Sequence, residues 1–195
     1  MYLYLVRHGQ STGNERQLFF GVSDHPLTEL GREQARQAAD KLREVEFARC
    51  VSSDLSRAWE TAVICTEGRG AAPEPCPALR EQDMGGMEDL TWGQAESRYG
   101  ELVGRLVGDW FHTTPPRGES PTRMRERVGA CVDGLIRQGE DTRVVAHNGS
   151  LSLILYHLGL AGEEELFHTD WFFRHGTYSA IRADENGAEL VHFNR

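Results

Sequence analysis

Polar side chains that could carry out catalysis follow three apolar segments of this 195-residue sequence. The polar groups are Arg7-His8-Gly9-Gln10-Ser11-Thr12-Gly13-Asn14 after residues 2–6, Ser53-Asp54-Leu55-Ser56-Arg57 after the run ending at Ser52, and His147-Asn148-Gly149-Ser150 after residues 143–146. In open α/β sheets, ligands bind outside the carboxyl ends of the strands. If the three segments are neighbouring parallel strands, two histidines and two arginines converge at one edge of the sheet.

This set of side chains suits a phosphoryl group. Arg7 and Arg57 can each present a two-pronged guanidinium to phosphate oxygens. Arg57 falls near the start of an expected helix, where the positive end of the helix dipole repels a cation. A bound anion would offset this repulsion. One neutral imidazole can attack phosphorus, and a second can donate a hydrogen bond to the transferring oxygens. A lone histidine after a strand is more often a solvated or satisfied side chain, so the convergence of the three loops carries this prediction.

The alternation of strand-like and helix-like segments predicts an α/β fold. Strands are expected at 2–6, 47–52 and 143–146, helices at 31–44, 55–67 and 151–158, and a hairpin around Asn186-Gly187 within 177–193. Ser53 or Asp54 is expected to cap the helix at 55–67, and residues 78–81 are expected to be extended. The segment 91–138 is predicted to be mostly helical with a break at 113–118, as a cap region around 90–140. No linker divides the chain, so a single domain over residues 1–195 is expected.

Composition excludes several classes of protein. The chain has 21 Lys and Arg against 30 Asp and Glu, a net charge of −9, which disfavours nucleic acid as a partner because that binding needs many spread cationic contacts. No apolar stretch approaches the ~20 residues of a membrane-spanning helix, and the first residues lack the pattern of a signal peptide. The four cysteines, without a CxxC pair, are expected to be reduced and structural. We therefore expect a cytoplasmic protein without a membrane partner, and a homodimer stays open because no segment identifies an interface.

The sequence resembles the histidine phosphatase superfamily, also called the phosphoglycerate-mutase-like family. The resemblance spans nearly the whole chain in the order found in the family, in the blocks Leu5-Val6-Arg7-His8-Gly9-Gln10-Ser11-Thr12-Gly13-Asn14, Pro26-Leu27-Thr28-Glu29-Leu30-Gly31, Ser52-Ser53-Asp54-Leu55-Ser56-Arg57-Ala58-Trp59-Glu60-Thr61-Ala62, Leu79-Arg80-Glu81, Gly118-Glu119-Ser120 and Val145-Ala146-His147-Asn148-Gly149. It implies a three-layer α/β/α fold with a mostly parallel central sheet.

The resemblance also implies a role for individual residues. His8 would be the nucleophile that becomes a phosphohistidine, and Glu81 would protonate the leaving alcohol and then activate water. Arg7, Arg57 and His147 would hold the phosphoryl oxygens. Further substrate-binding positions would be Asn14, Ser11, Phe20, Gly21 and Asn148. No metal ion and no cofactor are implied.

The chain departs from the family pattern at three points. Phe20 stands where Thr or Gln is frequent, and at the mouth of a pocket it would favour a substrate with an apolar or planar part, although one of Phe19 and Phe20 is expected in the core. Asn148 stands where glycine is common. The stretch 84–92 resembles the phosphatase branch and lacks the basic residue that mutases carry there for a substrate carboxylate.

The leading hypothesis is a phosphomonoesterase that acts on a small phosphorylated metabolite. The alternatives are a 2,3-bisphosphoglycerate-dependent phosphoglycerate mutase and a phospho-ligand binding module, the latter disfavoured because the catalytic set is intact. A sugar phosphate, a phosphoglycerate derivative and a nucleotide-like phosphate such as α-ribazole phosphate all remain open as substrates.

Other conspicuous residues have structural explanations. The histidines at 25, 112, 168, 175 and 192 lack metal-ligand spacing. Trp171-Phe172-Phe173 is expected to be a buried strand, and the arginines at 117, 123, 125 and 127 are expected to be a solvated helix face.

Overall fold

The computed structural model describes residues 1–166 and 169–195, and its centre is a six-stranded sheet in the order β4-β3-β6-β1-β7-β8. The strands are β1 (Tyr2–Arg7), β3 (Arg49–Ser52), β4 (Pro73–Pro75), β6 (Thr142–Ala146), β7 (Tyr178–Asp184) and β8 (Gly187–His192). The first four of these run parallel to one another, whereas β7 runs antiparallel to β1 and β8 runs antiparallel to β7. The predicted α/β fold with a mostly parallel sheet is therefore confirmed, as is the hairpin, whose turn contains Asn186.

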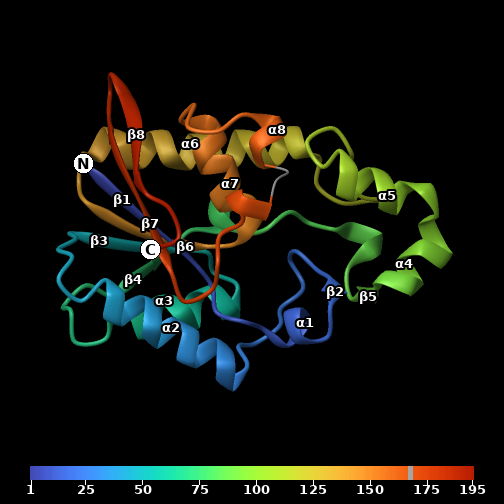
Figure 1. Ribbon diagram of the computed structural model, residues 1–195, viewed down its shortest axis with the longest axis horizontal. Coiled ribbons are helices and arrows are strands. Elements are labelled where there is room, and N and C mark those ends of the chain that lie inside the picture. The colour runs from blue at the N-terminus through green and yellow to red at the C-terminus, as the bar shows by residue number, and fades with distance from the viewer. Residues whose placement is uncertain (167–168) are drawn as a thin grey trace.

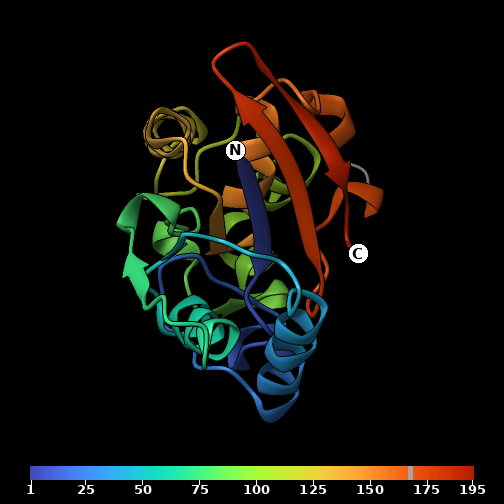
Figure 2. The same ribbon diagram turned by 90° about the vertical axis from the view of Figure 1, so that its left-hand side faces the viewer.

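Helices cover both faces of the sheet. The helices α2 (Glu29–Lys41) and α3 (Ser56–Thr66) lie on one side, and α6 (Pro121–Gln138) and α7 (Asn148–His157) lie on the other (Figures 1 and 2). Successive side chains of a strand point to opposite faces, and the strands bury both. Leu5 belongs to the apolar core with α6 and α7, whereas Val6 belongs to the core with α2 and α3. Burial on both faces explains why these strands read as continuous apolar runs.

A smaller helical region lies at the end of the molecule opposite the N-terminus (Figure 1). It contains α4 (Trp92–Tyr99), α5 (Glu101–Gly108) and the two-stranded sheet of β2 (Leu18–Phe19) and β5 (Leu90–Thr91). A separate apolar cluster stabilises it, formed by Met87, Ala95, Val103 and Leu106. The helices within 91–138 and the break at 113–118 are as predicted. The remaining short elements are α1 (Thr12–Glu15), α8 (Glu163–Leu166), and the 3-10 turns η1 (Pro77–Leu79), η2 (Gly85–Met87) and η3 (Thr169–Trp171).

The carboxyl ends of β1, β3 and β6 lie side by side. Arg7 pairs with Ala146, and Ser52 pairs with Val145. The first residues beyond the strands continue this pairing, because the His8 N–H donates to the Ala146 carbonyl at 3.0 Å and the Ser53 N–H donates to the Val145 carbonyl at 2.9 Å. The three polar groups singled out from the sequence thus start from one edge of the sheet.

Three local predictions are wrong. Leu55, not Ser53 or Asp54, is the N-cap of α3, because the Ser53 hydroxyl contacts His147 and the Asp54 carboxylate pairs with Arg80. Residues 77–79 form η1 instead of an extended piece. The aromatic run 171–173 is not a strand: Trp171 ends η3, and Phe172 is 43% exposed.

The described residues contain no helix that is long and apolar enough to cross a membrane. Nor do residues 1–166 and 169–195 contain a group of three or more His, Cys, Asp or Glu side chains that could hold a metal ion; His168 lies outside these residues. The four cysteines are free thiols.

Candidate active site

The His8 ring is buried directly beyond the end of β1. Its Nδ1 lies 2.7 Å from the Gly9 carbonyl oxygen. Because a carbonyl oxygen can only accept, Nδ1 carries the proton, and in the neutral ring the lone pair is at Nε2. Burial, followed by the charges of His147, Arg57 and Arg7, lowers the pKa of His8 well below its usual value. The ring is therefore neutral at pH 7, with its lone pair at Nε2.

His147 lies against His8, with ring centroids 5.0 Å apart. Its Nε2 is 2.8 Å from the Ser53 hydroxyl, so the loops after β6 and β3 meet through a side-chain contact. The His147 Nδ1 is buried and makes no close hydrogen bond among the described residues, while the ring faces the Ser150 backbone N–H in a capping box at the start of α7. Burial and the neighbouring Arg57 and Arg7 lower the pKa of this imidazole well below its usual value. A buried ring nitrogen without a close hydrogen bond suits contact with a ligand.

Arg57 is fully buried at the start of α3, as its position in the sequence suggests. Its two terminal nitrogens donate to the carbonyls of Ser23 (3.0 Å) and Gly21 (2.6 Å), while its buried Nε has no partner among the described residues. Burial lowers the pKa of Arg57 to about 10, which leaves it charged at pH 7. No carboxylate accepts a hydrogen bond from this guanidinium in the part of the chain that the structure describes, so an anion would stabilise it.

Arg7, near the start of the chain, is bound by a backbone carbonyl from the C-terminal part of the chain. Its Nη1 donates to the Phe173 carbonyl at 2.8 Å, and its buried Nε has no partner within residues 1–166 and 169–195. Arg7 and Arg57 both lower the pKa of His8 and both interact favourably with the charge of Glu81. The site therefore combines two guanidinium groups with buried donors that lack partners.

The Glu88 carboxylate fixes the loop that holds Arg57. It accepts hydrogen bonds from the backbone N–H groups of Gly21, Val22, Ser23 and Met84 at 2.8–3.1 Å. The carbonyls of that same loop face Arg57. This partly buried network orients the guanidinium through the loop, because Glu88 holds the backbone N–H groups and Arg57 binds the carbonyls of the same loop.

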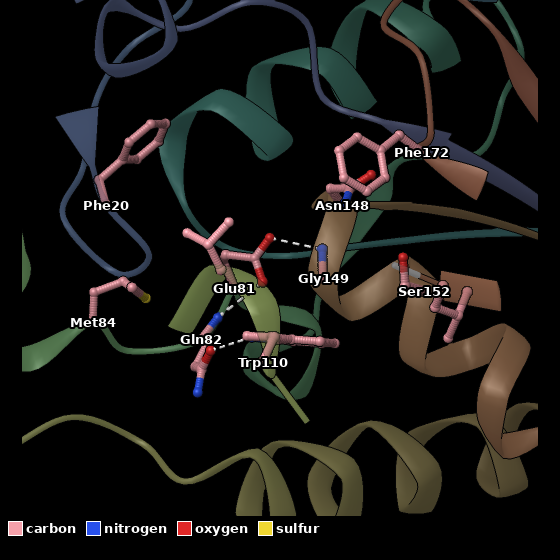
Figure 3. A pocket seen from close by; sticks show the side chains of 11 residues that line it. Phe20, Glu81, Gln82, Met84, Trp110, Asn148, Gly149, Ser152 and Phe172 are labelled. Carbon is pink, nitrogen blue, oxygen red and sulfur yellow. Dashed lines mark hydrogen bonds between the residues drawn. The ribbon is translucent and has the colours of Figure 1, made fainter. Parts of the chain in front are cut away.

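The Glu81 side chain lies at the amino end of α7. Its Oε2 accepts a hydrogen bond from the Gly149 N–H at 2.9 Å, and its Oε1 accepts one from the Gln82 N–H at 3.0 Å (Figure 3). Arg127 holds the backbone around Glu81, because its guanidinium donates to the carbonyls of Ala78 (2.8 Å), Arg80 (2.7 Å) and Glu81 (3.0 Å). Arg127 is thus not the solvated residue expected from the sequence.

Three other predicted residues shape the loops. Ser11 is fully buried and caps α1, donating through its backbone N–H and its hydroxyl to the Asn14 Oδ1, both at 3.0 Å. This leaves the Nδ2 amino group of Asn14 as its donor for a ligand. Gly21 serves the site through its backbone, with the N–H on Glu88 and the carbonyl on Arg57.

A pocket of about 510 Å³ opens beside Glu81. Phe20 and Met84 lie on one side of the carboxylate, Asn148 and Phe172 lie on the other, and Trp110 lies below (Figure 3). The remaining lining residues are Gln82, Val107, Gly149, Ser152 and Leu166. Phe20 also covers Arg57, whose guanidinium carbon is 4.8 Å from the ring centroid, whereas Phe19 stacks on Trp92 in the small apolar cluster. The polar atoms of the wall belong to Glu81, Gln82, Asn148 and Ser152, in a largely apolar surface.

The structure thus brings His8, His147, Arg7 and Arg57 together by contact or by charge, and Glu81 faces both the arginines and the pocket. Asn148 is also a pocket residue, and its Oδ1 accepts from the Phe173 N–H at 3.0 Å. Sequence reasoning missed several neighbours of the site, because neither their types nor their spacing distinguish them from ordinary surface or core residues. These are Glu88, Trp110, Arg127, Phe173 and His175.

Known proteins are similar to this chain in sequence and in architecture. The adenosylcobalamin/alpha-ribazole phosphatase of Salmonella typhimurium (strain LT2) is 34% identical over 203 residues, covering 100% of this chain and 96% of the relative. The probable phosphoglycerate mutase GpmB of Yersinia pestis (strain Pestoides F) is 32% identical over 155 residues, covering 78% of this chain and 72% of the relative. The crystal structure of the alpha-ribazole phosphatase from Shigella flexneri has a TM-score of 0.90 and 29% identity, covering 100% of this chain and 96% of that one.

The phosphatases among these relatives fit a phosphoric monoester hydrolase. A model of the histidine phosphatase superfamily (branch 1) matches residues 3–195, which include every site residue described above. The chain therefore belongs to the histidine phosphatase superfamily, branch 1.

Proposed function

We propose that this protein hydrolyses a small phosphomonoester through a covalent phosphohistidine at His8. The observation that carries the proposal is the His8 ring, whose Nδ1–H is committed to the Gly9 carbonyl so that Nε2 keeps its lone pair. Around this ring, the buried Nε–H groups of Arg7 and Arg57 lack acceptors among the described residues, and the His147 ring lies beside His8. Such donors match the equatorial oxygens of a transferring phosphoryl group, whose charge must be stabilised.

The reaction takes two steps. In the first, His8 Nε2 attacks phosphorus, the bond to the leaving oxygen breaks, and the Glu81 carboxyl group gives its proton to that oxygen. In the second, Glu81 takes a proton from water, the oxygen of that water attacks phosphorus, and the bond from phosphorus to Nε2 breaks to release phosphate. Asn14 supplies a further donor through Nδ2. Apart from the substrate and the attacking water, these two steps use groups of protein side chains.

The pocket beside Glu81 supports a leaving alcohol with an apolar, planar part. Phe20, Trp110 and Phe172 offer aromatic surface to such a group, and Asn148 and Ser152 offer hydrogen bonds. Of the substrates considered, a nucleotide-like phosphate such as α-ribazole phosphate has an aromatic base of this kind. The relatives named as alpha-ribazole phosphatases support the same choice.

A phosphoglycerate mutase is the second candidate, favoured by the Yersinia pestis relative. A mutase must bind a substrate carboxylate, and a cation is the usual partner for that group. Among the described residues, neither lysine nor arginine lines the pocket of about 510 Å³ beside Glu81, whereas Arg80, Arg117, Arg123 and Arg127 line a second pocket that Glu81 also borders. A leaving alcohol in the first pocket favours hydrolysis, and a substrate carboxylate bound in the second pocket would favour the mutase.

Phosphate release tests the proposal directly. Replacing His8→Ala is expected to lower kcat by about 10⁴-fold or more on an aryl phosphate, and acid-labile phosphate is expected on the wild-type protein after rapid quenching. A screen of α-ribazole phosphate, sugar phosphates and phosphoglycerates then compares kcat/KM. Formation of 2-phosphoglycerate from 3-phosphoglycerate, dependent on 2,3-bisphosphoglycerate, would instead establish the mutase; turnover by the His8→Ala variant at the wild-type rate would refute the phosphohistidine.

A further inference from the structure

A third imidazole lies against the candidate nucleophile. The ring of His175, in the loop between η3 and β7, has its centroid 5.6 Å from that of His8. Its Nδ1 is 2.5 Å from the backbone carbonyl oxygen of His8. The oxygen can only accept, so His175 donates through Nδ1–H. This contact joins residues that are 167 positions apart in the chain.

The loop that carries His175 is attached to the site at further points. The backbone of Phe173 donates to Asn148 and accepts from Arg7, at 3.0 and 2.8 Å. On its outer side, the Arg174 N–H donates to the Asn194 Oδ1 at 2.9 Å, and the Asn194 Nδ2 donates to the Phe172 carbonyl at 2.8 Å. The His175 hydrogen bond is therefore one of several that fix this loop against the end of β1.

Two successive carbonyl groups determine how residue 8 is held. The Gly9 carbonyl accepts from the His8 ring, and the carbonyl before it, that of His8, accepts from His175. The first contact selects the tautomer of His8. The second holds the carbonyl end of the peptide group between His8 and Gly9, whose N–H donates to the Thr61 hydroxyl at 3.1 Å. A peptide group held in this way restrains the orientation of the Gly9 carbonyl and thus of the His8 ring.

The charge state of His175 suits this role. Burial, followed by the charge of Arg7, lowers the pKa of His175 to about 4. The ring therefore donates a hydrogen bond at pH 7 without adding a cation to a site that already holds Arg7 and Arg57. A lysine or arginine in its place would add positive charge beside His8.

We propose that His175 is a positioning residue that holds the His8–Gly9 peptide so that His8 presents Nε2 to the phosphoryl group. This inference rests on the proposed phosphohistidine. The transition state includes a partial bond to Nε2, whereas bound inorganic phosphate does not. Loss of the His175 N–H is therefore expected to weaken binding of the transition state more than binding of phosphate.

The test compares His175→Phe, which keeps an aromatic ring beside His8 but lacks the N–H, with His175→Asn, whose amide N–H can occupy the place of Nδ1–H. The measurements are kcat, KM, and the inhibition constants of vanadate, which adopts the geometry of the transition state, and of inorganic phosphate. For His175→Phe we expect kcat to fall about 10- to 100-fold and the inhibition constant of vanadate to rise by the same factor. KM and the inhibition constant of inorganic phosphate are expected to change by about 3-fold or less. His175→Asn is expected to recover most of the loss.

A merely structural role gives a different result. A partly unfolded variant has fewer active molecules, which lowers kcat but leaves the inhibition constant of vanadate unchanged. His157→Phe is the matched control. His157 lies at the end of α7, outside the site, and its Nε2 is 2.7 Å from the Asp133 carboxylate. This variant is expected to leave both inhibition constants unchanged. An unchanged vanadate constant for His175→Phe, or equal losses for the Phe and Asn variants, would overturn the proposal.

Failure of the proposed function is recognised separately. If His8 is not the nucleophile, the wild-type protein yields no acid-labile phosphate and His8→Ala retains turnover, whatever the His175 variants do. If His8 is the nucleophile and only the role of His175 is wrong, the wild-type results hold and the two His175 variants fail the comparison above.

Discussion

Glu81 and Gly149 fit each other at the amino end of α7. The Gly149 N–H donates to Glu81 Oε2 at 2.9 Å, and a Cβ atom at residue 149 would overlap Oε1 of the same carboxylate. The carboxylate also lies at a helix N-terminus, where negative charge is favoured. The glycine thus brings the candidate proton donor onto the end of the helix that follows His147.

The Gly149→Ala substitution is expected to displace Glu81 and to lower kcat about 10- to 100-fold. The loss should depend on the leaving group, because a good leaving group needs little protonation. We therefore expect a large loss with an alkyl phosphate and a small one with p-nitrophenyl phosphate, and the same pattern for Glu81→Gln. Equal losses on both substrates would contradict the role of Glu81 as proton donor.

The Glu88→Ala substitution is expected to lower the free energy of unfolding by about 3 kcal/mol, because four backbone N–H groups lose their acceptor. The loop that holds Arg57 loosens, so the inhibition constant of inorganic phosphate should rise as well. Denaturant unfolding and phosphate inhibition measure the two effects. Asp89, which is exposed and contacts His25 and Ser23, provides the control variant Asp89→Ala, for which a smaller effect on phosphate inhibition is expected.

The Arg127→Ala substitution is expected to lower kcat about 10-fold or more, because the backbone that carries Glu81 loses three hydrogen bonds to its carbonyls. Among the described residues, Arg125 on the same helix contacts the side chains of Thr122 and Glu163 and the rings of Phe111 and Tyr156, and it does not bond to the backbone that carries Glu81. Arg125→Ala is therefore the matched control, with kcat near that of the wild type. A kcat for Arg127→Ala equal to the control would show that Glu81 is held without Arg127.

The Trp110→Ala substitution tests the substrate pocket. The Trp110 Nε1–H donates to Gln82 at 2.6 Å, and its ring lines the wall below Glu81. Loss of the ring is expected to raise KM for a phosphate ester with an aromatic alcohol by about 10-fold, with little change for glycerol phosphate. Equal changes in KM for the two esters would place the aromatic group of the substrate elsewhere.

Stability should fall in weak acid. The pKa values of His8, His147 and His175 are lowered from 6.5 in the folded protein, that of His175 to about 4. Below pH 6.5 these histidines bind protons in the unfolded chain but not in the folded protein. The free energy of unfolding that they contribute above pH 6.5 is therefore lost as the pH falls toward their folded pKa values. Each histidine contributes a slope of up to about 1.4 kcal/mol per pH unit. Most carboxylates titrate below about pH 5. His175→Asn should therefore reduce the slope of the unfolding free energy against pH by about half a proton at pH 6.5 and by nearly one proton at about pH 5. An unchanged slope would contradict the assigned shift.

Several site residues could be predicted because a strand end is a local feature. Arg7, His8 and His147 directly follow apolar runs, and parallel strands place their carboxyl ends at one edge of a sheet. Arg57 was recognisable as a cation near a helix start, where it needs an anion. The prediction failed where tertiary contacts compete for a side chain: Ser53 does not provide the cap of α3, because its hydroxyl contacts His147.

The sequence by itself therefore determined the α/β fold, the family and the residue types that meet at the end of the sheet, since alternating apolar periods and polar strand ends can be read over a few residues. Only the tertiary structure decided how those residues are held. Arg127 crosses to the backbone of Glu81, Glu88 reaches the loop that holds Arg57, and His175 reaches the carbonyl of His8. These contacts join segments far apart in the chain, and a hydrogen bond depends on distances of a few tenths of an ångström that only the packing of the helices and loops on the sheet establishes.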